Sequence, residues 1–260
     1  MNTVTGLPAP DDLAALVDVL LAADTADTAD TAGTGRAAVS DTARAAFAAE
    51  RPGPLPDHWW LAVPGETYEA AFEVLGLHDR IPVTVRYGLA AQVHDDKYTP
   101  EEVHRVFVTP EYAGWRLIYA ESPLREATWW PHDVIERLSA ACGRAQVYFQ
   151  DPLADAMIWA AAEDGTVVRG YWRNSEPEWT GEPLPWEERL TVEDFEDEEE
   201  FEDAYPEPNA SEEQSFGTAA ARLSLHPAMI TAETPVRGHG WLALTVAGAG
   251  HGGFGGTPQL

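Results

Sequence analysis

The chain contains a single cysteine, Cys142, among its 260 residues, and this scarcity excludes two kinds of stabilising framework. One thiol can form no internal disulfide, and it cannot build a zinc site from several thiolates. Cys142 ends a predicted helix beside Ala140 and Ala141. That apolar setting indicates a buried structural thiol rather than a nucleophile.

Basic residues are also scarce, with 16 Lys and Arg against 44 Asp and Glu and only one lysine, Lys97. The formal net charge of −28 argues against direct binding of nucleic acid, which needs clustered cations, and against anionic membrane surfaces. A basic protein partner, a cation or a gain in solubility remain as explanations of the charge. No cofactor is indicated.

Long apolar runs are missing as well, since none approaches the roughly 20 residues that cross a bilayer. The apolar stretch after Met1 carries no leading positive charge and is interrupted by Asp18, so it does not fit a secretory signal peptide. The expected location is therefore the cytoplasm.

Acidic residues, in contrast, are concentrated in one run that no basic residue interrupts between Arg189 and Arg222. Its twelve members are Glu193, Asp194, Glu196, Asp197, Glu198, Glu199, Glu200, Glu202, Asp203, Glu207, Glu212 and Glu213. So dense a run repels itself and cannot bury enough apolar surface to fold alone. We expect a disordered acidic insert over residues 189–215.

The N-terminal part predicts helices separated by a linker. Apolar residues at helical spacing predict an amphipathic helix within residues 1–22, and the repeat ADTADTADTAGTG predicts a flexible linker over 23–35. Further helices are predicted at Ser40–Glu50 and Glu66–Leu75, and the alternation of Val83, Val85 and Tyr87 predicts a strand.

The middle of the chain predicts an α+β fold with a largely antiparallel sheet and packed helices, within a main domain over residues 36–188. Residues Glu163, Asp164 and Gly165 predict a tight hairpin. The predicted strands are Arg105–Thr109, Trp115–Ala120, Ala145–Phe149, Ala156–Ala162 and Thr166–Trp172, with a helix over Asp133–Cys142. Residues 216–247 predict one helix, Phe216–Ile230, followed by a strand, and 248–260 a disordered tail.

The stretch from Val103 to Glu188 contains the strand GWRLIYA, the Asp-Gly hairpin and the loop GEPLPWEE. In these features it resembles an uncharacterised family of bacterial proteins of actinobacterial type. The resemblance covers under half of the chain and its motifs are structural. It implies a discrete domain, and it implies no activity.

One group of residues has the chemistry of a metal site. His94, Asp95 and Asp96, with His104 ten positions after His94, contain two imidazoles and carboxylates. The spacing matches no motif with a known mechanism, and histidines beside aspartates in loops are usually solvated, so no metal site is assigned. The chain also has no Gly-x-Ser-x-Gly elbow or phosphate-binding glycine loop, so no catalytic residue is assigned.

Arg169, Tyr171 and Arg173 alternate along a predicted strand and would share one of its faces. An exposed stripe of this kind can bind a carboxylate or a phosphate. The alternative, which we favour, is that Glu176, Glu178 or the acidic run neutralises these arginines within the protein.

Tryptophan is abundant, with ten residues. Adjacent tryptophans are not expected to point inward together, and partly exposed tryptophans are enriched at binding hot spots. The candidate binding residues are therefore Trp59, Trp60, Trp129, Trp130, Trp179 and Trp186, together with the arginine stripe. The alternative is that these tryptophans clamp loops onto the core.

The favoured interpretation is a non-enzymatic acidic binding protein, such as an immunity- or antitoxin-like inhibitor of a basic protein partner. Two alternatives remain open. The first is an enzyme acting on a small molecule through the His94, Asp96 and His104 region, and the second is a regulatory or scaffold protein of bacterial development or defence.

Overall fold

The central strand of the protein, β1 (Trp59–Pro64), is buried on both faces. Successive side chains of a strand point to opposite sides of a sheet. Trp59 and Val63 accordingly enter one hydrophobic core, while Trp60 and Ala62 enter a second one. A sheet that is apolar on both faces needs a covering layer on each side, and the helices supply these layers.

The computed structural model describes residues 50–98, 103–120, 132–151, 156–173, 177–187 and 216–251. The predicted helix within 1–22, the linker 23–35, nearly all of the helix Ser40–Glu50, the acidic insert 189–215 and most of the tail 248–260 lie outside these residues.

All strand pairs of the described sheet are antiparallel, and its main path runs in the order β2-β11-β3-β5-β1-β6-β7-β8-β9. Strand β4 pairs with both β5 and β10 beside this path. The other strands are β2 (His78–Val83), β3 (Arg105–Val108), β4 (Glu111–Tyr112), β5 (Trp115–Tyr119), β6 (Arg144–Asp151), β7 (Ala156–Glu163), β8 (Thr166–Arg173), β9 (Pro177–Thr180), β10 (Val236–Arg237) and β11 (Gly240–Leu244).

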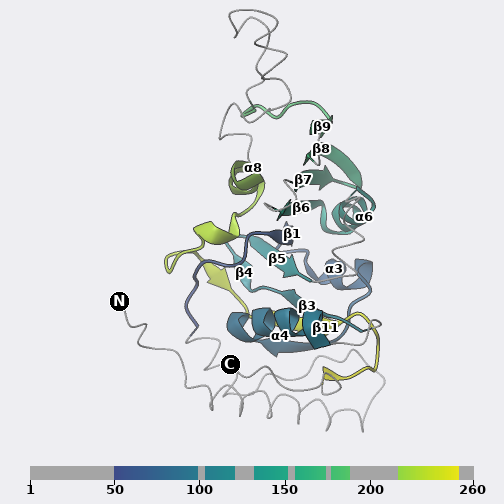
Figure 1. Ribbon diagram of the computed structural model, residues 1–260, viewed down its shortest axis with the longest axis vertical. Coiled ribbons are helices and arrows are strands. Elements are labelled where there is room, and N and C mark those ends of the chain that lie inside the picture. Colours follow the sequence, from purple (N-terminus) through teal and green to yellow (C-terminus); the bar gives the residue numbers. More distant parts are fainter. Residues whose placement is uncertain are drawn as a thin grey trace, which may run out of the picture.

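Helices cover both faces of the sheet (Figure 1). Helices α3 (Glu69–Val74) and α6 (His132–Cys142) pack on the face of Trp59, and we call the core beneath them the α3/α6 core. Helices α4 (Val85–Tyr98) and α8 (Phe216–Leu223) pack on the opposite face, above the α4/α8 core. The fold is therefore α+β, with a largely antiparallel sheet and packed helices, as predicted.

The middle of the chain agrees closely with the sequence. Strands β3 and β5 pair through Phe107 with Tyr119 and Val108 with Ile118, and α6 covers the predicted helix. At the hairpin between β7 and β8, Asp164 and Gly165 have φ of 46° and 87°. Positive φ at both positions is the requirement of the type I′ turn that an Asp-Gly pair favours.

The strand predicted at Val83–Tyr87 is wrong, because β2 ends at Val83 and α4 begins at Val85. The Thr84 hydroxyl accepts a hydrogen bond from the Tyr87 amide at 3.3 Å, and the Glu50 carboxylate accepts bonds from the Val85 and Arg86 amides at 2.8 and 3.1 Å. These bonds satisfy three free amides of the helix start. Because Glu50 is remote in sequence, the local alternation of apolar residues gave no sign of this helix.

The single helix predicted at Phe216–Ile230 is also wrong. Helix α8 ends at Leu223, and a separate 3₁₀ turn, η4 (Pro227–Met229), follows it. Pro227 lacks an amide hydrogen and disfavours a helical conformation at His226, so the α-helix cannot continue through it. None of the described helices is long and apolar enough to span a bilayer.

The contact between α4 and β3 generates the first prediction. A Cβ atom at Gly88 in α4 would overlap the ring of Phe107, which is fully buried in β3. We expect Gly88→Ala to lower the free energy of unfolding by about 1–3 kcal/mol, because overpacking outweighs the better helix propensity of alanine. Urea unfolding would measure it. Gly53→Ala is the control, since nothing lies within 4 Å of a Cβ there. A stabilised Gly88→Ala protein would contradict this packing.

Candidate functional site

The first tryptophan pair of the predicted binding surface lies in the core of the protein. Trp59 is 2% exposed and Trp60 is 0% exposed. The expectation that adjacent tryptophans cannot both point inward is wrong here, because both faces of β1 are covered. The Trp60 ring stacks on Tyr148 with 4.7 Å between the ring centroids. This pair therefore stabilises the fold instead of presenting a recognition surface.

Helix α8 is attached to the sheet beside Trp60. The Phe216 ring, at the start of α8, lies 5.9 Å from the Trp60 ring. At the other end of the helix, the Gln146 side-chain amide donates to the Leu223 carbonyl at 3.1 Å and accepts from the Tyr148 hydroxyl at 3.1 Å. Aromatic packing and the hydrogen bond from Gln146 to Leu223 thus fix α8 on the sheet, and the Tyr148 hydroxyl orients the Gln146 amide.

The predicted stripe of Arg169, Tyr171 and Arg173 shares one strand face, but its first two members are not exposed. Arg169 is 0% exposed and Tyr171 is 3% exposed, and Tyr171 belongs to the α4/α8 core. The side chain of Arg173 lies outside the described part of the chain. The predicted exposed binding stripe is therefore wrong for Arg169 and Tyr171.

Arg169 is neutralised inside the protein, and its partner is Glu187. The Arg169 Nε donates to the two Glu187 carboxylate oxygens at 2.8 and 3.0 Å, and Nη2 forms a further ion pair with Oε2. Nη1 donates to the carbonyls of Thr180 and Gly181 at 3.3 and 2.8 Å. A charged pair with side chains 0% and 1% exposed is stable only when it is bonded as fully as this one. Internal pairing was the right alternative, although neither Glu176 nor Glu178 provides it.

Trp179 and Trp186 close over this ion pair and the neighbouring strands. The Trp179 ring lies 4.1 Å from the guanidinium carbon of Arg169 and 4.5 Å from the Tyr171 ring. The Trp186 ring lies 6.1 Å from the buried ring of Trp159. Both tryptophans are half-buried, so they clamp the segment 177–187 onto the sheet. Trp129 and Trp130 lie outside the described residues.

The region of His94 differs from its prediction as a polar loop. Residues 94–96 belong to α4, and their side chains lie outside the described part of the chain. His104 precedes β3, as expected, and its amide donates to the Thr245 hydroxyl at 3.0 Å. Among the described residues, no three His, Cys, Asp or Glu side chains are arranged to hold a metal ion.

Both segments that flank the acidic run are attached to the same face of the sheet. Glu187 is held by Arg169, and Leu184 and Trp186 pack against the α4/α8 core. Phe216, where the described chain resumes, belongs to the same core. The described segments that precede and follow the acidic run in the sequence therefore both pack on the face that carries α4 and α8.

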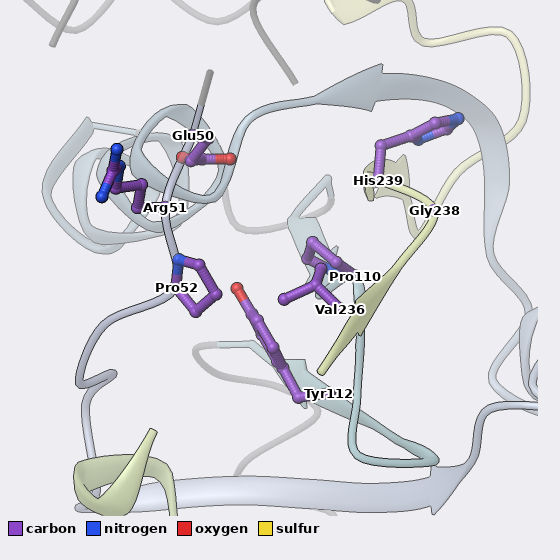
Figure 2. Close-up of a pocket in the computed structure, with 8 residues that line it drawn as sticks. All are labelled: Glu50, Arg51, Pro52, Pro110, Tyr112, Val236, Gly238 and His239. Carbon is purple, nitrogen blue, oxygen red and sulfur yellow. The ribbon is translucent and has the colours of Figure 1, made fainter. Parts of the chain in front are cut away.

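A small open pocket lies between the segment 50–52, strand β4 and strand β10 with the turn that follows it (Figure 2). Its free volume of about 20 Å³ is the room of a single water molecule. The Glu50 carboxylate and the Tyr112 hydroxyl both point into it, whereas the Arg51 and His239 side chains point away. Burial raises the pKa of Glu50, and burial together with the negative charge of Glu50 raises the pKa of Tyr112.

A second buried arginine, Arg116, lies next to this pocket and was missed at the level of sequence. It is 5% exposed, its Nη1 donates to the carbonyls of Thr109 and His239 at 2.6 and 3.0 Å, and its guanidinium carbon lies 3.8 Å from the Tyr68 ring centroid. Burial lowers the pKa of Arg116, and the charges of Tyr68, Glu111 and Glu69 act in the opposite direction. An arginine inside the apolar strand WRLIY was the one sequence signal for it.

No protein-family model, curated protein or solved structure matches the chain. The resemblance of Val103–Glu188 to a bacterial family therefore stays a prediction.

The buried ion pair of Arg169 and Glu187 leads to a prediction about its contribution to the free energy of unfolding. In Glu187→Gln the charge of Arg169 stays buried without its counter-charge, and we expect a loss of about 3–5 kcal/mol in the free energy of unfolding. Glu69→Gln is the matched control, because Glu69 and its partner Arg80 are partly exposed, with side chains 47% and 24% accessible. It should change stability by less than about 1 kcal/mol. Urea unfolding of both variants would test the contrast, and equal losses would contradict it.

His226, at the start of η4, predicts that the stability of the fold depends on pH. His226 Nδ1 accepts the Ala228 amide at 3.1 Å, and burial lowers the pKa of His226, with the charge of Asp57 partly opposing this. The folded protein thus takes up a proton less readily than the unfolded chain, whose imidazole has a pKa of about 6.5. Stability contributed by neutral His226 should be lost as the pH falls through that value.

His226→Asn should remove this part of the pH dependence, because an asparagine oxygen can still accept the Ala228 amide. We expect the urea midpoint of the wild-type protein to fall more steeply than that of His226→Asn between about pH 7.5 and about pH 5.5. Parallel curves for the wild-type and His226→Asn proteins would show that His226 is not the titrating group.

Proposed function

We propose that the protein is a non-enzymatic acidic binding protein that captures a basic protein partner. The observation that carries this proposal is the attachment on both sides of the acidic run, through Glu187 bonded to Arg169 and through Phe216 packed against Trp60. In the sequence, the twelve acidic residues lie between two segments that are both anchored on one face of the domain. A partner bound there would meet both the acidic run and that face.

The charge of the chain supports a basic partner. With a formal net charge of −28, the protein attracts cations over a distance, and such steering raises association rates by about 10- to 1000-fold at low salt. Electrostatic complementarity of this kind also discriminates against acidic partners. Nucleic acid and anionic membranes are disfavoured as direct ligands for the same reason.

An inhibitor of immunity or antitoxin type, acting in the bacterial cytoplasm, is the form of this function that we favour. Such an inhibitor has to capture a cationic effector quickly and block the surface with which it binds its own anionic target. The acidic run has the charge to do so, and the segments before and after it are anchored to the folded domain.

The proposal is tested by immobilising the full chain and a variant whose twelve acidic residues between Glu193 and Glu213 are replaced by Gln and Asn. Both are exposed to lysate of the native host at about 0.05 M and about 0.5 M salt, since screening weakens exposed charge pairs. We expect a basic protein to be retained by the full chain at low salt, and its retention to drop at least about tenfold at high salt or in the neutralised variant.

The matched control neutralises exposed acidic residues of the folded domain and leaves the run intact. Glu66, Glu73, Glu163 and Glu182 serve this purpose, because all four are exposed. This control should retain the partner at close to the wild-type level. Retention that ignores both the acidic run and the salt, or no retained basic protein at all, would refute the proposal.

A further inference from the structure

The two buried arginines Arg169 and Arg116 differ in one respect that points to a ligand. A guanidinium binds a carboxylate or a phosphate most strongly through two parallel N–H groups, such as those on Nε and Nη2. In Arg169 this edge is occupied by the Glu187 carboxylate. In Arg116 only Nη1 is hydrogen-bonded, and the buried Nε has no partner among the described residues.

The carboxylates around Arg116 are already paired with other arginines. The carboxylates that act on it belong to Glu111 and Glu69. Glu111 accepts two hydrogen bonds from Arg237, at 2.9 and 2.7 Å, and Glu69 forms an ion pair with Arg80. The guanidiniums of Arg80, Arg116 and Arg237 thus face two carboxylates. The positive charge of Arg116 is the one without a bonded carboxylate among the described residues.

The surroundings of Arg116 compensate its charge only in part. The Tyr68 ring stacks on the guanidinium, and two backbone carbonyls accept its Nη1 protons. A cation–π contact offsets only part of the unfavourable desolvation of an unpaired buried ion. A bound anion would both satisfy Nε and balance the remaining charge.

We propose that the Nε–Nη2 edge of Arg116 binds an oxyanion, which is the carboxylate or phosphate group of a small molecule. The group approaches Nη2 beside Gly238, which lies in the exposed turn between β10 and β11 and carries no side chain. A Cβ atom at Gly238 would lie 3.0 Å from Nη2. The aromatic ring of Tyr68 lies against the guanidinium, whose carbon is 3.8 Å from the ring centroid.

This site is independent of the acidic run and of the proposed protein partner. It is formed by β5, by the turn before α3 and by the turn between β10 and β11, whereas the clamp that precedes the acidic run lies at β8 and β9. Failure of either proposal therefore leaves the other untouched.

The test is a titration of the ¹⁵N-labelled full chain with inorganic phosphate and, separately, with benzoate, at constant ionic strength. The Nε–Hε signal of Arg116 is identified by its loss in Arg116→Lys. We expect this signal to shift saturably with one probe or both, while the Nε–Hε signal of Arg169, which is already bonded to Glu187, stays in place. The probe with the lower midpoint identifies phosphate or carboxylate as the preferred group.

Two variants confirm the assignment through the indole N–H signal of Trp241, which donates to the Tyr68 hydroxyl at 3.3 Å. In Arg116→Lys, which keeps the charge but loses the two-pronged edge, the midpoint of its titration should rise at least about tenfold. Arg144→Lys is the matched control, because Arg144 is exposed and lies over Trp115. It should leave the midpoint unchanged.

Absence of a saturable shift of the wild-type Arg116 signal with both probes would overturn the proposal, and this result does not depend on the folding of any variant. Equal midpoints for the Arg116 and Arg169 signals would overturn it too, because they would show a general effect of the anion on the protein.

Discussion

Two covered faces of one sheet are the constraint on which the rest of the structure depends. Every strand near the centre has to supply apolar side chains in both directions, so alternation between polar and apolar residues disappears there. The neighbours Trp59 and Trp60 show the result, since each fills a different core. The alanines of β7 show it as well, with Ala160 and Ala162 in the α3/α6 core and Ala161 buried on the opposite side.

The same constraint explains what happens to the few basic residues. Arg105, Arg116 and Arg169 are all buried, although the whole chain has only 16 Lys and Arg residues. A guanidinium can be buried because its five donors reach several carbonyls or a carboxylate at once. Each buried arginine is also a cation removed from the surface. Arg169 takes the carboxylate of Glu187 into the interior with it, so this pair leaves the balance of surface charge unchanged.

The sequence predicted those parts of the fold that depend on local patterns. Helix α6, the pair β3–β5 and the hairpin between β7 and β8 follow from apolar spacing and from the Asp-Gly turn. Helix α4 could not be predicted in this way, because Glu50 caps it from another part of the chain. Pro227 was a local sign of the break between α8 and η4, but the prediction of one helix over 216–230 did not take it into account.

The candidate sites were harder to predict than the fold, since exposure is set by tertiary packing. Arg169 and Tyr171 alternate as expected, yet the segment 177–187 folds over them and removes them from the surface. The need for an internal partner of Arg169 was foreseeable from the many nearby glutamates, whereas the choice of Glu187 was not. The unpaired Nε of Arg116 could not be predicted from the sequence, because it is recognised only when its hydrogen bonds are compared with those of Arg169.

The position of β11 in the sheet has a consequence for the synthesis of the protein. Trp241 pairs with Pro82 in β2 on one side and with Val108 in β3 on the other, so a late strand separates two early ones. On the ribosome, β2 and β3 emerge long before the strand that joins them. Their edges stay open for as long as the remaining chain is being made, and exposed strand edges promote aggregation. The closing contacts are also far apart in sequence, which slows folding. This end of the sheet is therefore completed only after β11 has been synthesised.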